Sequence, residues 1–313
     1  MEKANKAKPG RTAGASLWKR IRKNKWTYIL FLPALIYLVI FCYAPFYGIQ
    51  IAFKDYKFFA GIEASDWVGL KWFKMVLTDP KFFQLLRNTI KISLLRILFT
   101  MPVPIIFAIL LTEVKGKRFK KAVQTITSFP NFLSWVVFAG IIYNFTGPYG
   151  VINRVLQNKG MDTINLTTNA DAFLPLIIIT CILKEFGYGA IIYLAAIAGV
   201  DEQLYEAAAI DGAGRMKQIW HVLLPGIRPI ICFQYCVAAA NVLSAGFDQI
   251  FMFLNPPLYE VGDIIDTYVY RLGLLNTKYE LSTAVGLMKG VVSCVLLVVA
   301  NKVSKKIGER AIW

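Results

Sequence analysis

Long apolar segments alternate with short polar segments along the whole chain. Six apolar runs are long enough to cross a bilayer, because an α-helix rises about 1.5 Å per residue and a hydrocarbon core is about 30 Å thick. The predicted spans cover residues 28–51, 88–111, 123–145, 173–198, 230–254 and 281–301. Hydrophobic residues make up 57% of the 313 positions, more than a soluble domain of this length needs. The pattern predicts an all-α integral membrane protein with six transmembrane helices.

Prolines are expected to distort two of these spans. Pro102 and Pro104 should kink the second span, and Pro130 followed by Asn131 should break the third. Membrane helices tolerate such breaks when neighbouring groups bond the carbonyls that the proline frees.

The distribution of charge orients the spans. The chain carries 35 Lys and Arg residues against 19 Asp and Glu, a formal net charge of +16. The basic residues gather in 1–27, 115–121 and 302–310, whereas 52–86 and 255–281 mix both signs. By the positive-inside rule the basic segments face the cytoplasm, so both termini are predicted to be cytoplasmic. This distribution beside apolar runs also argues against nucleic acid as a partner.

The predicted organisation follows from this topology. Its parts are a basic cytoplasmic arm (1–27), the first span with its outer loop (28–87), a core of five spans (88–303) and a cytoplasmic tail (304–313). A secretory signal peptide also begins basic and then apolar, but this apolar run is too long and has no small-residue cleavage site. We therefore expect the first span to be retained.

The polar segment between the fourth and fifth spans has its own pattern. Residues 204–210 are rich in Ala and predict a short helix, which Asp211, Gly212 and Gly214 should end. A second helix follows, with apolar residues at i, i+3, i+4 and i+7. These residues are Met216, Ile219, Trp220 and Leu223. The pattern predicts two short helices, joined by a turn, with an apolar face that needs a partner.

Three motifs follow one another in this segment: Glu-Ala-Ala, Asp-Gly-Ala and Leu-Pro. Their order and spacing resemble the coupling loop of permease subunits of binding-protein-dependent ABC importers. The residues that carry the resemblance are Tyr205, Glu206, Ala207, Ala208, Asp211, Gly212, Ala213, Gly214, Ile219, Leu224 and Pro225. The resemblance implies a type I importer permease (MetI-like) fold, with residues 200–228 docked on a cytoplasmic ATPase. The alternative is an amphipathic helix pair lying on lipid.

Other motifs resemble the sugar-importing branch of that family. They are Asn88-Thr89, the stretches 130–135 and 246–251, and the stretch 266–271. The last two are most similar to a subgroup that handles oligosaccharides and polysaccharide fragments. The resemblance covers about residues 88–303. It implies a multi-pass permease of the bacterial plasma membrane that moves sugars by alternating access.

The resemblance also implies a set of partners. They are a second, similar permease in a heterodimer, two cytoplasmic ATPase subunits, an extracytoplasmic solute-binding protein and membrane lipid. The sequence has no Gly-x-x-x-x-Gly-Lys-Ser/Thr loop, the motif that cradles nucleotide phosphates. ATP and Mg²⁺ are therefore expected on the partner ATPase, and this chain is expected to be neither an enzyme nor a cofactor-binding subunit.

Metal binding and catalysis lack candidate residues. Cys232 and Cys236 share a helix face, but no His or acidic residue nearby completes a metal site. All five cysteines lie in apolar runs and are expected to be small buried hydrophobic residues. The single His221 is expected to face solvent or a partner.

Polar side chains within the spans are candidates for a substrate path, because they are costly in lipid. In the fifth span such residues recur at helical spacing and should share one face. Together with two from the fourth span, the candidates are Glu185, Tyr188, Gln234, Asn241, Ser244 and Asp248. The alternative role is interhelical polar contact, worth about 1 kcal/mol each.

Three further alternatives stay open from the sequence. Glu206 is either a favourable charge in the first turn of a short helix, worth about 0.3–1 kcal/mol, or, as the resemblance implies, a pivot against Arg or Lys of the ATPase. The protein as a whole is alternatively an ATP-independent transporter or channel. A membrane-embedded enzyme needs a carboxylate cluster, and Glu260, Asp263 and Asp266 come closest. Those three are expected outside, as a docking surface for a binding protein.

Overall fold

The computed structural model describes residues 22–163 and 168–306. Six helical stretches are long and apolar enough to cross a membrane, which confirms the predicted six-span helical architecture. They cover 25–53, 80–113, 135–158, 170–198, 215–240 and 279–302. The predictions for the basic arm up to residue 21 and for the tail from residue 307 fall outside the described residues.

The elements before the fourth span are mostly helices in chain order. They are α2 (Lys25–Tyr37), a π-helical turn (Leu38–Tyr43), a 3₁₀ segment (Ala44–Phe53), β1 (Lys54–Lys57), β2 (Gly61–Trp67), α3 (Lys71–Thr78), α4 (Pro80–Thr100), α5 (Pro102–Glu113), α6 (Lys117–Ser128), a 3₁₀ turn (Phe129–Phe132), α7 (Trp135–Thr146) and α8 (Val151–Asn158).

The elements from the fourth span onward are also helical. They are α9 (Ala170–Ala198), α10 (Glu202–Ile210), α11 (Arg215–Gln218), a π-helical turn (Ile219–Leu223), α12 (Leu224–Ala240), a 3₁₀ turn (Val242–Ser244), α13 (Phe247–Phe253), a 3₁₀ turn (Pro256–Leu258), α14 (Tyr259–Gly262), α15 (Ile265–Tyr270), a π-helical turn (Arg271–Leu275) and α16 (Tyr279–Lys306).

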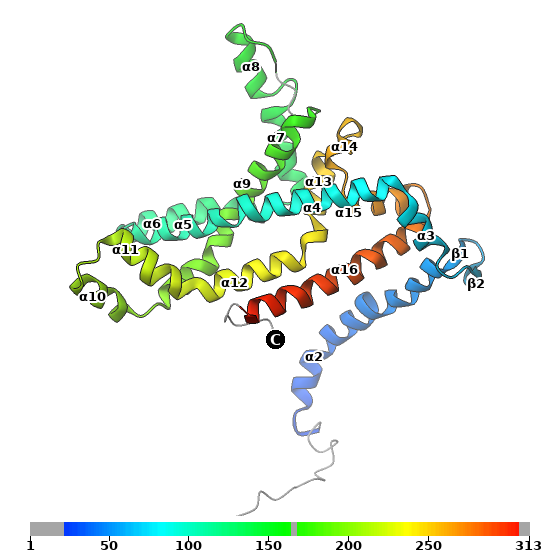
Figure 1. Cartoon of the computed structure of the whole chain (residues 1–313), viewed down its shortest axis with the longest axis horizontal. Helices are drawn as coiled ribbons and strands as arrows, with labels where there is room; N and C mark the ends of the chain where they lie inside the picture. The colour runs from blue at the N-terminus through cyan, green and yellow to red at the C-terminus, as the bar shows by residue number, and fades with distance from the viewer. Residues whose placement is uncertain (1–21, 164–167, 307–313) are drawn as a thin grey trace, which may run out of the picture.

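The bundle forms around α4, α5 and α9. In Figure 1, α4 and α5 run across the molecule almost end to end, while α12 and α16 lie below them. Helix α9 packs against α5, α6 and α12, and α16 packs against α12. One apolar core includes Phe173 and Phe253, and a second includes Tyr193, Leu223 and Ile227. These two cores fix the cytoplasmic loop and the middle of the fifth span.

The first span is set apart from this bundle. Helix α2 has no buried residue, and in Figure 1 it stands away from the other helices. Only its continuation, 44–53, packs against α16 and α3. Within a single copy of this chain, most of the first span is therefore left for lipid or another subunit to cover.

The outer loop after the first span corrects the all-helical prediction. Strands β1 and β2 pair antiparallel, with Lys54 opposite Trp67. Gly61 begins the second strand at φ +79°, a left-handed conformation that favours glycine. The side chain of Lys54 donates to the Ile62 carbonyl at 2.6 Å, which ties the hairpin together. A local hairpin of this kind gives only a weak signal in a loop of mixed charge.

The third span is interrupted where Pro130 predicts it. The chain forms a 3₁₀ turn over Phe129–Phe132 and restarts at α7, where the Ser134 hydroxyl caps the Val137 N–H. The predicted boundaries of 123–145 are wrong, because α6 already begins at Lys117, and the stretch apolar enough to cross the membrane begins at Trp135.

The fifth span also departs from its predicted course. The prediction of one helix over 230–254 is wrong, because the helix that enters at Arg215 ends at Ala240. Ala245 and Gly246 then adopt left-handed backbone conformations, φ +44° and +79°, which an α-helix cannot include. The chain continues in a new direction as α13. Asn241, Ser244 and Asp248 therefore do not share one helix face with Gln234.

The cysteines are less buried than the sequence predicts. Cys181 is buried and the others are not: Cys232 and Cys236 are partly buried, whereas Cys42 and Cys294 are exposed. The last two lie on spans whose outer faces this chain does not cover itself. All five are free thiols.

Candidate functional site

The cytoplasmic loop between the fourth and fifth spans folds as two helices with a tight turn. Asp201 caps α10, since its carboxylate accepts the Gln203 N–H at 3.0 Å. At the other end Gly212 has φ +74°, and the Ala213 N–H bonds back to the Ala208 carbonyl at 2.9 Å. This is the glycine-dependent helix ending known as a Schellman motif. The predicted helix, turn and restart are present.

The second helix of the loop continues directly into the fifth span. Helix α11, a π-helical turn and α12 form one helical stretch from Arg215 to Ala240. The expectation that Pro225 and Pro229 separate the loop from the span is wrong, because both lie in the first turns of α12. The first proline position of a helix needs no N–H, so Pro225 is accommodated there. A displacement of the loop helix therefore moves the fifth span with it.

The loop presents apolar side chains to the outside of the molecule. Leu204 is 52% exposed, Ile210 87%, Met216 66% and Trp220 62%. The predicted apolar face is only partly free, because Leu223 is 1% exposed and belongs to the core beneath the loop. The face thus divides into an inner residue that anchors the loop and outer residues without cover in this chain.

The remaining predicted coupling residues surround that apolar surface. Glu206, Ala207, Asp211, Gly212, Gly214 and Pro225 are exposed, whereas Tyr205, Ala208, Ala213, Ile219 and Leu224 are partly buried. Helix α10 begins at Glu202, so Glu206 lies in its second turn. The interpretation of Glu206 as a first-turn helix charge is therefore wrong.

An ion pair that sequence reasoning did not identify ties the loop to the second span. Arg215 at the start of α11 binds Glu113 at the end of α5 through two hydrogen bonds, Nε to Oε2 at 2.8 Å and Nη2 to Oε1 at 2.6 Å. The same guanidinium lies 5.8 Å from the centre of the Tyr205 ring. Burial raises the pKa of Tyr205, so its hydroxyl stays protonated at neutral pH. The loop is thereby connected to the second as well as the fifth span.

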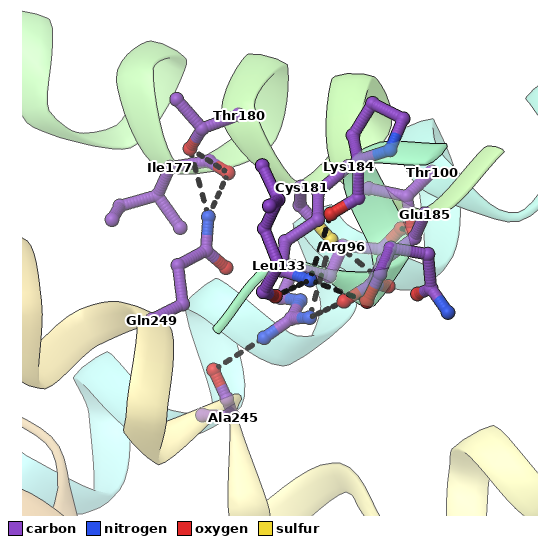
Figure 2. A network of polar contacts seen from close by, with 12 residues as sticks. Arg96, Thr100, Leu133, Ile177, Thr180, Cys181, Lys184, Glu185, Ala245 and Gln249 are labelled. Atoms are coloured by element: carbon purple, nitrogen blue, oxygen red, sulfur yellow. Dashed lines mark hydrogen bonds and ion pairs between the residues drawn. The ribbon is translucent and has the colours of Figure 1, made fainter. Parts of the chain in front are cut away.

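A polar network lies where the fifth span breaks. Figure 2 shows Arg96 of α4 reaching both α9 and the break. Its Nη1 donates to the Ala245 carbonyl at 3.0 Å, and its Nη2 lies 3.6 Å from the Glu185 carboxylate. A Cβ atom on Gly246 would lie 1.5 Å from Nη1, so only glycine fits beside this guanidinium. The break is therefore held by a charge from a distant part of the sequence.

A second cation serves the interruption of the third span. Lys184 is buried, and its ammonium group donates to the carbonyls of Asn131 at 3.0 Å and Leu133 at 2.8 Å. It also lies 5.2 Å from the ring centre of Trp135. Lys184 thus satisfies carbonyls that the 3₁₀ turn leaves without helical partners. Its role in the fold is structural.

The six candidates for the substrate path occupy different environments. Glu185 and Tyr188 are about half exposed, and Asn241 and Asp248 are exposed, whereas Gln234 and Ser244 are partly buried. Figure 2 places Glu185 in the network around Arg96. The same region contains Gln249, whose amide donates to the Ile177 carbonyl at 2.7 Å while its own oxygen is buried without a partner. The sequence pattern had not drawn attention to Gln249 or Arg96.

The outer carboxylates differ from the predicted docking surface. Asp263 is 1% exposed and forms an ion pair with Arg271. Asp266 forms an ion pair with Lys289 of α16 at 2.6 Å. These two residues fix the loop 255–278 to the bundle, so neither is a free carboxylate. Of the three, only Glu260 remains on the surface without an ion pair among the described residues.

Comparison with known proteins assigns this architecture to a family. The family described as the binding-protein-dependent transport system inner membrane component matches residues 94–309. The chain belongs to this family. The permease is accordingly a multi-pass bacterial membrane protein and a transport component of ABC type.

Named relatives cover nearly the whole permease. It is 41% identical over 96% of its length to protein LplB of Bacillus subtilis, and the match covers 95% of that protein. It is 43% identical over 94% of its length to the polygalacturonan/rhamnogalacturonan transport system permease protein YteP of the same organism, with 92% of that protein covered.

A solved structure shares the fold of the permease. It belongs to a bacterial ABC transporter involved in the import of the acidic polysaccharide alginate, with a TM-score of 0.85 and 37% sequence identity. The match covers 93% of the permease and 99% of that chain. A second structure of the alginate transporter contains a periplasmic protein with a bound alginate pentasaccharide.

Proposed function

We propose that this permease imports oligosaccharides or fragments of polysaccharides, with ATP hydrolysed by separate subunits. Relatives named for polygalacturonan and rhamnogalacturonan, for multiple sugars and for arabinooligosaccharides support the substrate class. The matched alginate transporter supports a polymeric sugar in particular.

The observation that carries the coupling role is the exposed surface of the cytoplasmic loop. Residues 200–228 combine a rigid two-helix turn with apolar side chains that this chain leaves uncovered. Large uncovered apolar surfaces on a folded protein mark interaction sites. We assign this surface to an ATPase, with Ala207 in close contact and Glu206 as the charged pivot. ATP and Mg²⁺ bind on that partner.

Two connections carry the motion of the loop into the membrane. The helix that begins at Arg215 continues into the fifth span, and the Glu113–Arg215 ion pair reaches the end of the second. When ATP closes the ATPase dimer, the loop moves as one body and displaces both spans. The resulting change of access opens the path towards a loaded extracytoplasmic binding protein.

The substrate path requires a second permease in this proposal. Asn241, Asp248 and Glu185 present polar groups near the break in the fifth span that this chain leaves partly uncovered. A similar but non-identical partner permease would complete a path lined by these groups, and sugar hydroxyls would bond to them. Tyr188, which lies 5.9 Å from the Phe132 ring, offers an aromatic surface beside them.

The test is a mild-detergent purification of the tagged chain from its native membrane, followed by mass spectrometry. Recovery of an ATPase and a second permease supports the proposal, and the associated binding protein can then be screened against glycans. A chain that purifies alone, with no ATPase after crosslinking at the loop, would favour an ATP-independent transporter instead.

A further inference from the structure

A second polar site lies at the outer end of the second span, far from the coupling loop. A pocket of about 900 Å³ opens between the first half of α4 and α14. By the charge topology, both elements are on the extracytoplasmic side. The pocket is lined by Pro80, Lys81, Phe83, Gln84, Leu85, Arg87, Asn88, Lys91, Tyr259, Glu260, Val261 and Asp263.

The wall of this pocket is rigid. The side-chain amides of Gln84 and Asn88 both donate to the Glu260 carbonyl at 2.9 Å, and Asn88 also reaches the Asp263 carbonyl at 3.2 Å. These contacts join segments more than 170 residues apart in sequence. The amide N–H groups are thereby occupied by the protein. They leave the charged side chains as the main polar groups that the pocket offers to a ligand.

The charges of the pocket are unbalanced. Arg87 and Lys91 are exposed, one helical turn apart on α4, and neither forms an ion pair within the described residues. Lys81 lies 5.3 Å from the Tyr268 ring centre. Of the two lining carboxylates, Asp263 is neutralised by Arg271, which leaves Glu260. Cations without partners near a membrane face are costly, so they point to an anionic ligand.

The available groups define the chemistry of that ligand. A guanidinium binds a carboxylate through two parallel hydrogen bonds, and a lysine ammonium adds a point charge beside it. Glu260 is the remaining acceptor and suits sugar hydroxyls. Phe83 is 56% exposed at the rim and offers an apolar surface to a sugar ring.

We propose that this pocket is an entry subsite for saccharides that carry carboxylates, with Arg87 and Lys91 binding the acid groups. The proposal rests on the proposed import of oligosaccharides and narrows it to uronate-containing chains. The pocket receives the acidic sugar at the outer mouth, before the sugar reaches the break in the fifth span.

The test uses the complete transporter in proteoliposomes with its binding protein. The variant Arg87→Gln/Lys91→Gln removes both charges and keeps the side chains polar. The matched control Lys74→Gln/Lys278→Gln removes two exposed basic residues of the outer loops that do not line the pocket. Each is assayed with oligogalacturonate, oligoglucuronate and oligomannuronate, and with the carboxyl-reduced form of each.

The expected result is specific for the acid group. Loss of two charge-assisted contacts should lower uptake of the transported acidic oligosaccharide by about tenfold or more, and raised salt should weaken wild-type uptake towards the same level. The control variant should change acidic uptake by less than about twofold. Association with the sugar-free binding protein should be unchanged in both variants.

Three results would overturn the subsite. They are a preference for the carboxyl-reduced sugars, an equal loss for acidic and reduced sugars in the double variant, and a loss of binding-protein association. The last would make the pocket a protein-docking surface. If the intact wild-type transporter takes up none of the sugars, and binding-protein-dependent ATPase activity is also absent, the proposed function itself fails.

Discussion

Replacement of Gly246 by alanine should destabilise the whole bundle through the break in the fifth span. Gly246 has φ +79°, where an L side chain costs about 1–2 kcal/mol. The added Cβ would lie 1.5 Å from Nη1 of Arg96. The guanidinium must then move and lose its bond to the Ala245 carbonyl, and a hydrogen bond from a charged group is worth about 1.5–3 kcal/mol. Together these losses amount to about 3–5 kcal/mol.

A thermal-stability assay measures this loss. The detergent-solubilised protein is heated, and the fraction that remains monodisperse is read by size-exclusion chromatography. Gly246→Ala should lower the midpoint by at least about 5 °C. The matched control is Gly290→Ala in α16, where a new Cβ meets nothing within 4 Å. Its midpoint should stay the same or rise, because alanine is the better helix former.

A double variant separates the clash from the backbone cost. In an Arg96→Ala background the guanidinium is absent, so the further loss caused by Gly246→Ala should shrink to the backbone term of about 1–2 kcal/mol. The reasoning is refuted if Gly246→Ala melts within about 1 °C of the wild type, or if its effect is the same with and without the Arg96 side chain.

Three further changes test other contacts. Glu206→Lys should abolish uptake while the chain still inserts into the membrane, and normal uptake would remove the pivot role. Glu113→Arg should lower binding-protein-stimulated ATPase activity by about fivefold, since the half-exposed pair with Arg215 is worth at most about 1 kcal/mol. Adding Arg215→Glu should restore much of that activity, and no recovery would argue against the tether. Gly187→Leu should give little monodisperse protein, because a Cβ there lies 2.3 Å from the Thr127 carbonyl group, and a normal yield would contradict that close packing.

The features that sequence predicted well are those that local residues determine. Span number follows from hydropathy, and the turn of the cytoplasmic loop follows from Gly212 after an Ala-rich helix. The interruption of the third span was visible because Pro130 lacks an N–H wherever it lies. In each case the physical cause is contained within a few neighbouring positions.

The features that sequence missed depend on distant partners. Residues 237–241 read as a good helix, yet Arg96 binds the Ala245 carbonyl from about 150 positions away and the helix ends. The Glu113–Arg215 pair likewise joins residues 102 positions apart. Asp263 appears in sequence as a free outer carboxylate, and only the fold shows that Arg271 neutralises it. No local pattern encodes such pairings.

The coupling role of the cytoplasmic loop has one direct test. A photoreactive amino acid is placed at Ala207, which is exposed on α10, and at Thr78 on the outer side as a control. After illumination of native membranes, the account predicts a covalent adduct between the Ala207 position and an ATPase subunit, changed in yield by ATP, and no such adduct from Thr78. An intact transporter that yields no ATPase adduct from Ala207 would contradict the account.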